Sequence, residues 1–198
     1  MTLRREGRLD LHAAAIVPPT EGAGAVLIVG AKGAGKSSLT LSLAMAGWRF
    51  LSDDYVLAWR DGVQIRLGSL RSALYLTPDA VERLPAHRPP GRDVPRTGKR
   101  MFEPEEIFPG QYLIEAPLAA VVFPERVQDA SSSLEPIRAI ESFQRLLALT
   151  PFLAADASAR PCLEVARSIA DLPSFALRAA PALLISETAS RLLHRAFP

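Results

Sequence analysis

The segment 30–37 carries the residue types that bind nucleotide phosphates. It reads Gly-Ala-Lys-Gly-Ala-Gly-Lys-Ser, the pattern of two glycines at a five-residue spacing followed by a lysine and a hydroxyl residue. Small residues let backbone N–H groups turn toward phosphates, Lys36 adds a point charge near the terminal phosphates, and the Ser37 hydroxyl can ligate Mg²⁺. The sequence therefore predicts a site for ATP and Mg²⁺ made of Gly30, Ala31, Lys32, Gly33, Ala34, Gly35, Lys36, Ser37 and Ser38.

The segments on either side of this loop support the interpretation. Residues 25–29 form a continuous apolar run, typical of a strand buried on both faces. Residues 36–46 have helical spacing, with Leu39 and Leu43 on one face and Gly47 positioned to end the helix. Strand, glycine-rich turn and helix N-terminus follow in the order that a P-loop requires, because the helix dipole favours a bound anion.

Two adjacent carboxylates, Asp53 and Asp54, follow the extended segment 48–52. In P-loop folds the strand after the loop helix can bring a carboxylate beside Mg²⁺. One aspartate would then face the metal while the other takes a proton from an acceptor hydroxyl, and their proximity would raise the pKa of one of them. The alternative is a solvated turn in which an aspartate caps the chain.

The rest of the chain predicts a mixed α/β fold in one domain, residues 1–198. Expected strands are 9–17, which contains His12, the hairpin strands 55–59 and 63–67, a strand at 116–123 and a short piece at 175–177. Expected helices are 77–84, 136–149, 163–170 and 187–197, with a short helix beside Glu103, Glu105 and Glu106. Residues 85–98, rich in proline and arginine, are expected to form an exposed, mobile loop.

Composition excludes several classes of protein. The single cysteine, Cys162, excludes a disulfide framework and a cysteine-cluster metal site. A net charge of +2 is too small to indicate nucleic-acid binding. The longest apolar runs are too short to span a bilayer, and the first residues lack the apolar stretch of a secretory signal. We therefore expect a cytoplasmic protein that binds neither nucleic acid nor membrane.

Several of these segments together resemble a known family. Leu11-His12-Ala13, the loop, Leu39, Gly47-Trp48 and Leu51-Ser52-Asp53-Asp54 are similar to the catalytic domain of HPr kinase/phosphorylase. A more distant resemblance is to the nucleotide core of ATP-dependent phosphoenolpyruvate carboxykinases, which share an Asp-Asp pair soon after the loop. The resemblance covers residues 12–57 and implies a P-loop-containing mixed sheet with flanking helices.

The resemblance also implies roles for individual residues. Lys36 would contact phosphates, Ser37 would bind Mg²⁺, and Asp53 and Asp54 would supply the metal contact and the catalytic base, in an order that stays open. His12 would lie on the strand beside the active site and belong to the catalytic group. The implied partners are an HPr-like protein or, as in related short kinases, a precursor peptide. The family also suggests a homo-oligomer.

Lys99 and Arg100 are two further candidates, because they follow the proline-rich segment and can contact the acceptor or neutralise charge on the transferring phosphoryl group. The alternative is a solvated basic turn. These features favour an ATP- and Mg²⁺-dependent kinase that phosphorylates a hydroxyl of a protein or peptide, with serine as the expected residue. Two alternatives stay open, a small-molecule kinase and a non-catalytic ATP-binding regulatory module.

Overall fold

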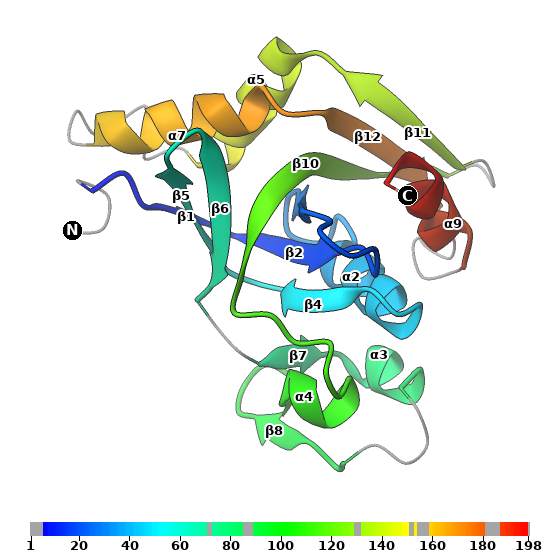
Figure 1. Ribbon diagram of the computed structural model, residues 1–198. Coiled ribbons are helices and arrows are strands. Elements are labelled where there is room, and N and C mark those ends of the chain that lie inside the picture. Colours follow the sequence, from blue (N-terminus) through cyan, green and yellow to red (C-terminus); the bar gives the residue numbers. More distant parts are fainter. Residues whose placement is uncertain are drawn as a thin grey trace.

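A nine-stranded mixed sheet forms the centre of the molecule (Figure 1). This computed structural model describes residues 6–70, 73–84, 89–128, 132–150, 153, 159–180 and 187–197. The main path of the sheet runs, in spatial order, through β1 (Leu9–Leu11), β5 (Val56–Asp61), β6 (Gln64–Ser69), β10 (Glu115–Arg126), β3 (Ala25–Val29), β2 (Ala13–Val17) and β4 (Arg49–Ser52). β12 (Ser174–Ala179) pairs with β10, and β11 (Ser132–Ile137) pairs with β12. The mixed α/β class predicted from the sequence is confirmed.

β10, the longest strand, connects the antiparallel part of this sheet to its parallel part. Its first residues pair antiparallel with β6, while its second half pairs parallel with β3 on one side and with β12 on the other. The carboxyl ends of three parallel strands therefore lie at the same edge of the sheet. In such sheets this edge is where ligands bind.

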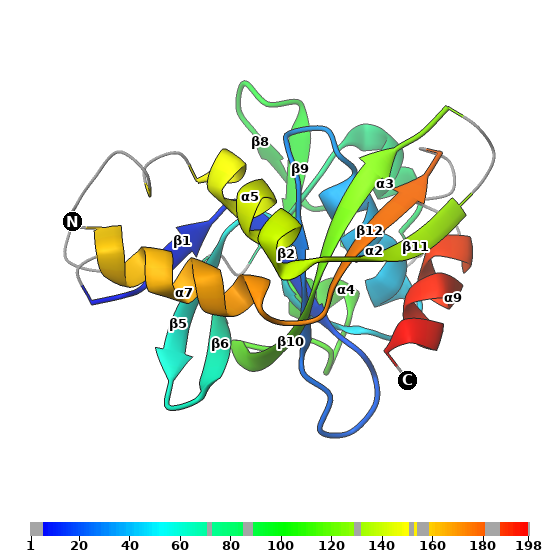
Figure 2. The same ribbon diagram turned by 90° about the horizontal axis from the view of Figure 1, so that it is seen from above.

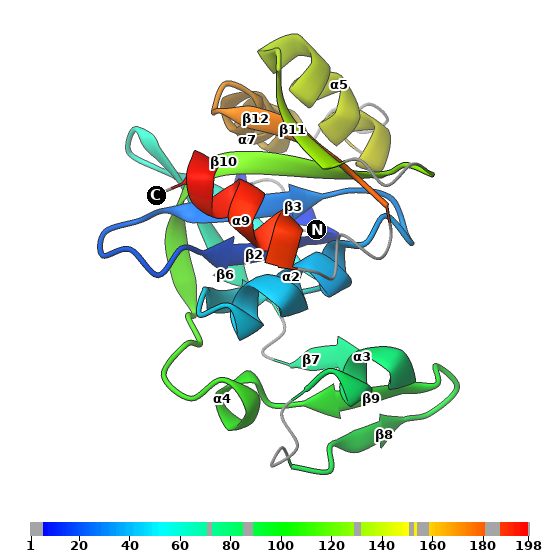
Figure 3. The ribbon, with the colours of Figure 1, turned by 90° about the vertical axis from the view of Figure 1, so that its right-hand side faces the viewer.

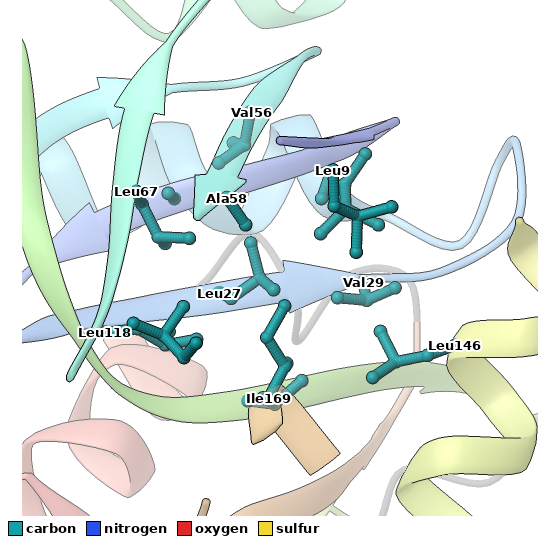
Figure 4. Packing of buried hydrophobic residues seen from close by; sticks show 14 of the residues in the cluster. Leu9, Leu27, Val29, Val56, Ala58, Leu67, Leu118, Leu146 and Ile169 are labelled. Atoms are coloured by element: carbon teal, nitrogen blue, oxygen red, sulfur yellow. The ribbon is translucent and has the colours of Figure 1, made fainter. Parts of the chain in front are cut away.

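Helices cover both faces of the sheet (Figure 2). One face carries α5 (Ala139–Leu149) and α7 (Arg160–Ala170), whose Leu146 and Ile169 share one buried cluster with Leu27, Val29 and Leu118 of the strands (Figure 4). The other face carries α2 (Lys36–Met45) and α9 (Glu187–Ala196). None of the helices within the described ranges has the length and apolar character that crossing a membrane requires.

The sequence of β3 is apolar throughout because both faces of the strand are covered. Leu27 packs in the cluster beneath α5 and α7, whereas Val26 and Ile28 pack in the cluster beneath α2. Every residue of the strand is buried, as predicted. A strand covered on both faces can hold its position under the loop that follows it.

A smaller three-stranded antiparallel sheet lies on the α2 side, away from α5 and α7 (Figure 3). It consists of β7 (Leu74–Leu76), β9 (Lys99–Phe102) and β8 (Arg92–Val94), flanked by α3 (Pro78–Glu82) and α4 (Pro104–Ile107). Leu74, Leu76 and Phe102 share one buried cluster with Leu39 and Leu43 of α2. The small sheet is thus packed beneath the helix that follows the glycine-rich loop.

Three predictions about elements need correction. The expected strand at 9–17 is broken at His12, so that β1 pairs with β5 while β2 pairs with β3 and β4. Pro136 lies in β11, and the helix begins only at Ala139. The segment 85–98 is not a plain loop: residues 85–88 lie outside the described part, but β8 pairs with β9. Its side chains are largely exposed, so the strand leaves no apolar pattern in the sequence.

The other expected elements are present with small shifts. The hairpin β5–β6 turns through Gly62, whose φ is 60°. α3 starts at Pro78 and α4 follows Glu103, as the proline and acidic signals indicated. β10 extends beyond the predicted 116–123, to Arg126, and this extension brings a charged residue to the edge where the parallel strands end.

Candidate active site

The glycine-rich loop joins the end of β3 to the start of α2 in a tight turn. Gly33 and Gly35 have φ values of 86° and 101°, which side-chain-bearing residues rarely adopt. Gly30 is needed for a different reason, since a Cβ there would lie 2.9 Å from the Cβ of Ala34. The loop therefore folds back on itself with its backbone exposed at the helix N-terminus, the arrangement that suits an anion.

Lys36 is held across this loop. Its Nζ donates to the carbonyl oxygen of Gly30 at 2.8 Å and to that of Ala31 at 3.4 Å. The residue is only 6% exposed, and burial lowers the pKa of its ammonium, with Asp54 raising it and Lys99 lowering it further. A buried ammonium with acceptors only on its own loop is ready to exchange them for phosphate oxygens.

Asp53 is a buried carboxylate with one oxygen unpaired. It is 3% exposed, and its Oδ2 accepts a hydrogen bond from the backbone N–H of Tyr75 at 3.4 Å. Its Oδ1 is buried and has no hydrogen-bond partner within the described part of the chain. Burial raises the pKa of Asp53 to about 7. A buried polar atom without a partner costs free energy, so it marks a place where a ligand is expected.

Asp54 is paired with His12. The Asp54 Oδ1 and His12 Nε2 atoms are 3.2 Å apart, and the His12 ring stacks on Tyr55 with centroids separated by 5.3 Å. Burial lowers the pKa of His12, Lys36 and Lys99 lower it further, and Asp54 opposes them. His12 lies in the break between β1 and β2, outside both strands.

A turn after β4 holds the two aspartates at different depths. The Ser52 hydroxyl donates to the carbonyl oxygen of Tyr55 at 2.8 Å and lies 3.5 Å from the backbone nitrogen of Asp54. This turn leaves Asp53 buried, while the side chain of Asp54 is 27% exposed. One carboxylate is therefore shielded from water and the other can be reached from outside.

These groups line one cleft of about 380 Å³. Its lining comes from the glycine-rich loop and the start of α2, the turn after β4, the small sheet, the break between β1 and β2, and the end of β10. The lining residues are His12, Lys32, Gly33, Gly35, Lys36, Ser37, Ser38, Asp53, Asp54, Tyr75, Lys99 and Arg126. Most of the predicted site residues are thus brought together. Gly30, Ala31 and Ala34 shape the loop without lining the cleft.

Arg100 is not brought to the cleft. Its Nε lies 3.1 Å from Asp93 Oδ1, and its Nη1 donates to the carbonyl oxygen of Pro90 at 3.5 Å. Of this predicted pair of cations, Lys99 lines the cleft with Asp53 and Asp54, and Arg100 does not.

Sequence reasoning missed two residues of the cleft. Arg126 ends β10, and side-chain alternation places it on the α2 side, opposite Glu125, which is held by Arg145 of α5 at 2.6 Å. A basic residue at the carboxyl end of a parallel strand was the available signal. Tyr75 contributes its backbone N–H to Asp53, a role that its side chain does not reveal.

The oxygen donors of the cleft suit Mg²⁺. Ser37, Asp53 and Asp54 offer one hydroxyl and two carboxylates, and the described residues contain no group of three or more His, Cys, Asp or Glu side chains that would hold a metal alone. Mg²⁺ commonly binds through one or two carboxylates together with phosphate oxygens and water. The unpaired Oδ1 of Asp53 fits such a partner.

Comparison with known proteins supports the fold. No protein-family model matches the chain, and no curated protein matches it in sequence. A solved structure, the HPr(Ser) kinase/phosphatase from Coxiella burnetii, aligns over 95% of this chain and 97% of its own, with a TM-score of 0.50 and 14% sequence identity. The chain has an HPr-kinase-like fold. At this identity the likeness concerns the fold alone, and it agrees with the resemblance seen in residues 12–57.

Proposed function

We propose that this protein is an ATP- and Mg²⁺-dependent kinase that transfers the γ-phosphoryl group to a hydroxyl of a protein or peptide. The observation that carries the proposal is the cleft itself, in which Lys36 of the loop faces a buried Asp53 and the Asp54–His12 pair. Phosphoryl transfer asks mainly for positioning and for neutralisation of charge, and the cleft supplies groups for both.

Each residue has a distinct part in this proposal. The loop amides and Lys36 bind the phosphates, and Ser37 with Asp53 would hold Mg²⁺. When bound, Mg²⁺ neutralises charge on the β- and γ-phosphates. Lys99, on the opposite wall, adds a second positive charge beside the transferring group.

Asp54 is the better candidate for the catalytic base. It is the more exposed of the two carboxylates and is within 3.2 Å of His12, whereas Asp53 is sealed against the small sheet. In the transfer step the acceptor hydroxyl oxygen bonds to the γ-phosphorus and its proton passes to Asp54. The bond from the γ-phosphorus to its bridging oxygen breaks, and ADP leaves.

The acceptor we propose is a serine hydroxyl on a protein or peptide. The solved structure of similar fold carries HPr(Ser) in its name, which makes an HPr-like protein the first acceptor to test, followed by a precursor peptide. An open cleft beside a small sheet gives a chain segment access to Asp54. Association of several copies of the chain stays a prediction.

The deciding experiment is transfer from γ-labelled ATP with Mg²⁺ to an HPr protein, to candidate peptides and to a cell extract. Lys36→Ala and Asp54→Asn are tested beside Asp61→Asn, which changes an exposed carboxylate of the β5–β6 hairpin. A labelled band that is lost in the first two variants and kept in the third supports the proposal.

Two other outcomes would replace the proposal. ATP consumption without a labelled protein or peptide indicates a small-molecule kinase. Nucleotide binding without consumption, unchanged in Asp54→Asn, indicates a regulatory module.

A further inference from the structure

A second hollow, of about 440 Å³, adjoins the catalytic cleft. It lies between α3 and the β8–β9 hairpin, and its lining residues are Pro78, Val81, Glu82, Asp93, Val94, Gly98, Lys99 and Arg100. Lys99 lines both spaces. A molecule in the hollow would therefore continue past Lys99 into the cleft that holds Asp54.

Lys99 lies near the end of the cleft where transfer takes place. Its charge lowers the pKa of His12 and of Lys36, so it is close to the groups at the terminal-phosphate end. In P-loop sites the loop amides cradle the inner phosphates and the lysine reaches the outer ones. A hollow entered past Lys99 thus adjoins the acceptor side of the site, not the nucleoside.

Four charged side chains line the hollow, Glu82, Asp93, Lys99 and Arg100, and two of them pair with each other. Arg100 and Asp93 neutralise each other, with Nε and Oδ1 at 3.1 Å. Lys99 faces the cleft, where a phosphoryl group would engage it. Glu82 is exposed and makes no hydrogen bond or ion pair within the described part of the chain. Lys99 lies where the hollow and the cleft meet, whereas Glu82 lines the hollow alone, so Glu82 is the carboxylate that an occupant of the hollow would meet away from the cleft.

The rest of the surface is apolar. Val81 is 6% exposed and forms a wall with Pro78 of the same helix, while the partly exposed Val94 contributes from β8. A hollow with an apolar wall, one free carboxylate and continuity with a catalytic cleft suits a short extended peptide. Extended chains place successive side chains on opposite sides, so that one can meet the wall while its neighbour meets the charge.

We propose that this hollow binds the segment that flanks the acceptor hydroxyl, with an apolar side chain against Val81 and Val94 and a Lys or Arg side chain against Glu82. The inference rests on the proposed function and adds the substrate class, a basic and apolar peptide segment next to the phosphorylated residue. Specificity would then come from a surface separate from the groups that perform transfer.

The test is a binding selection that does not depend on turnover. The full chain, immobilised with Mg²⁺ and a non-hydrolysable ATP analogue, captures peptides from a degenerate mixture with a fixed central serine. Wild type is expected to enrich Lys or Arg at one position beside the serine. Glu82→Lys should lose that enrichment or replace it with Asp or Glu, whereas Glu106→Lys, an exposed carboxylate of α4 outside the hollow, should keep it.

The result that overturns the inference is an unchanged preference in Glu82→Lys or no preference in wild type. A weaker affinity of Glu82→Lys for Mg²⁺·ATP, measured by calorimetry, would also overturn it and assign the hollow to the nucleotide. The labelled-transfer assay is scored separately. A charge-dependent selection with no transfer would support peptide binding in the hollow and reject the kinase proposal. Transfer without a charge-dependent selection would support the kinase proposal and reject peptide binding in the hollow.

Discussion

The carboxylate of Asp53 accepts a hydrogen bond from the backbone N–H of Tyr75, 3.4 Å away, and so links the turn after β4 to the small sheet. β4 and β7 belong to different sheets, and Asp53, directly after β4, has a buried Oδ1 without a hydrogen-bond partner among the residues that the structure describes. Opening of the small sheet would therefore alter the solvation of Asp53.

The ligand-free protein should lose stability as pH rises, because burial raises the pKa of Asp53 from 3.8 to about 7. The folded state then binds this proton more tightly than the unfolded state, so the Asp53 contribution is complete below pH 4 and is lost as pH rises toward 7. Asp53→Asn removes this dependence and should raise the free energy of unfolding above pH 7 by up to about 4 kcal/mol. Urea unfolding at pH 5 and pH 8 measures this free energy. An equal pH dependence of stability in the Asp61→Asn control and in Asp53→Asn would contradict the prediction.

Lys36→Ala should weaken Mg²⁺·ATP binding by roughly 10- to 100-fold, because it removes a charge-assisted hydrogen bond to phosphate. Folding should change little, since among the described residues the lysine side chain donates hydrogen bonds only to carbonyl oxygens of its own loop. Isothermal titration calorimetry gives the affinity. Lys32→Ala, an exposed lysine of the same loop, is the matched control. Equal losses in both variants would show that any loop charge suffices.

Gly30→Ala should destabilise the protein by about 1–3 kcal/mol, because the new methyl group would lie 2.9 Å from the Ala34 Cβ. The same overlap should deform the loop and reduce nucleotide affinity. The double variant Gly30→Ala/Ala34→Gly removes the second methyl group and should recover most of both losses. Thermal unfolding and calorimetry follow the two effects, and the absence of recovery would place the strain elsewhere.

Asp54→Asn should lower kcat by roughly 10²- to 10⁴-fold if the carboxylate takes the acceptor proton. His12→Phe should lower kcat less, because His12 acts through its 3.2 Å contact with Asp54. Neither change should alter the dissociation constant of ADP by much. Initial rates with the identified acceptor, together with ADP binding, test this. A larger effect of His12→Phe than of Asp54→Asn would make His12 the base.

Local sequence patterns determined a substantial part of this protein. The strand before the loop, the loop itself and the helix after it depend on apolar runs, glycines and helical spacing that act within a few residues of one another. The hairpin around Gly62 and the short helices at Pro78 and Pro104 are equally local. For these segments the side chains that specify the structure and the backbone they shape are neighbours in the chain.

Only the tertiary structure decided how the pieces meet. His12 reaches Asp54 because β1 leaves β2 to pair with β5, and Arg126 reaches the cleft because β10 continues beyond Phe123. Lys99 reaches the cleft because β9 pairs with β7 on one side and with β8, a strand without an apolar pattern, on the other. These positions depend on hydrogen bonds between backbone groups far apart in the chain, and backbone groups are the same in every residue but proline. Sequence can therefore supply the candidates for chemistry, while long-range pairing determines which of them share one cleft.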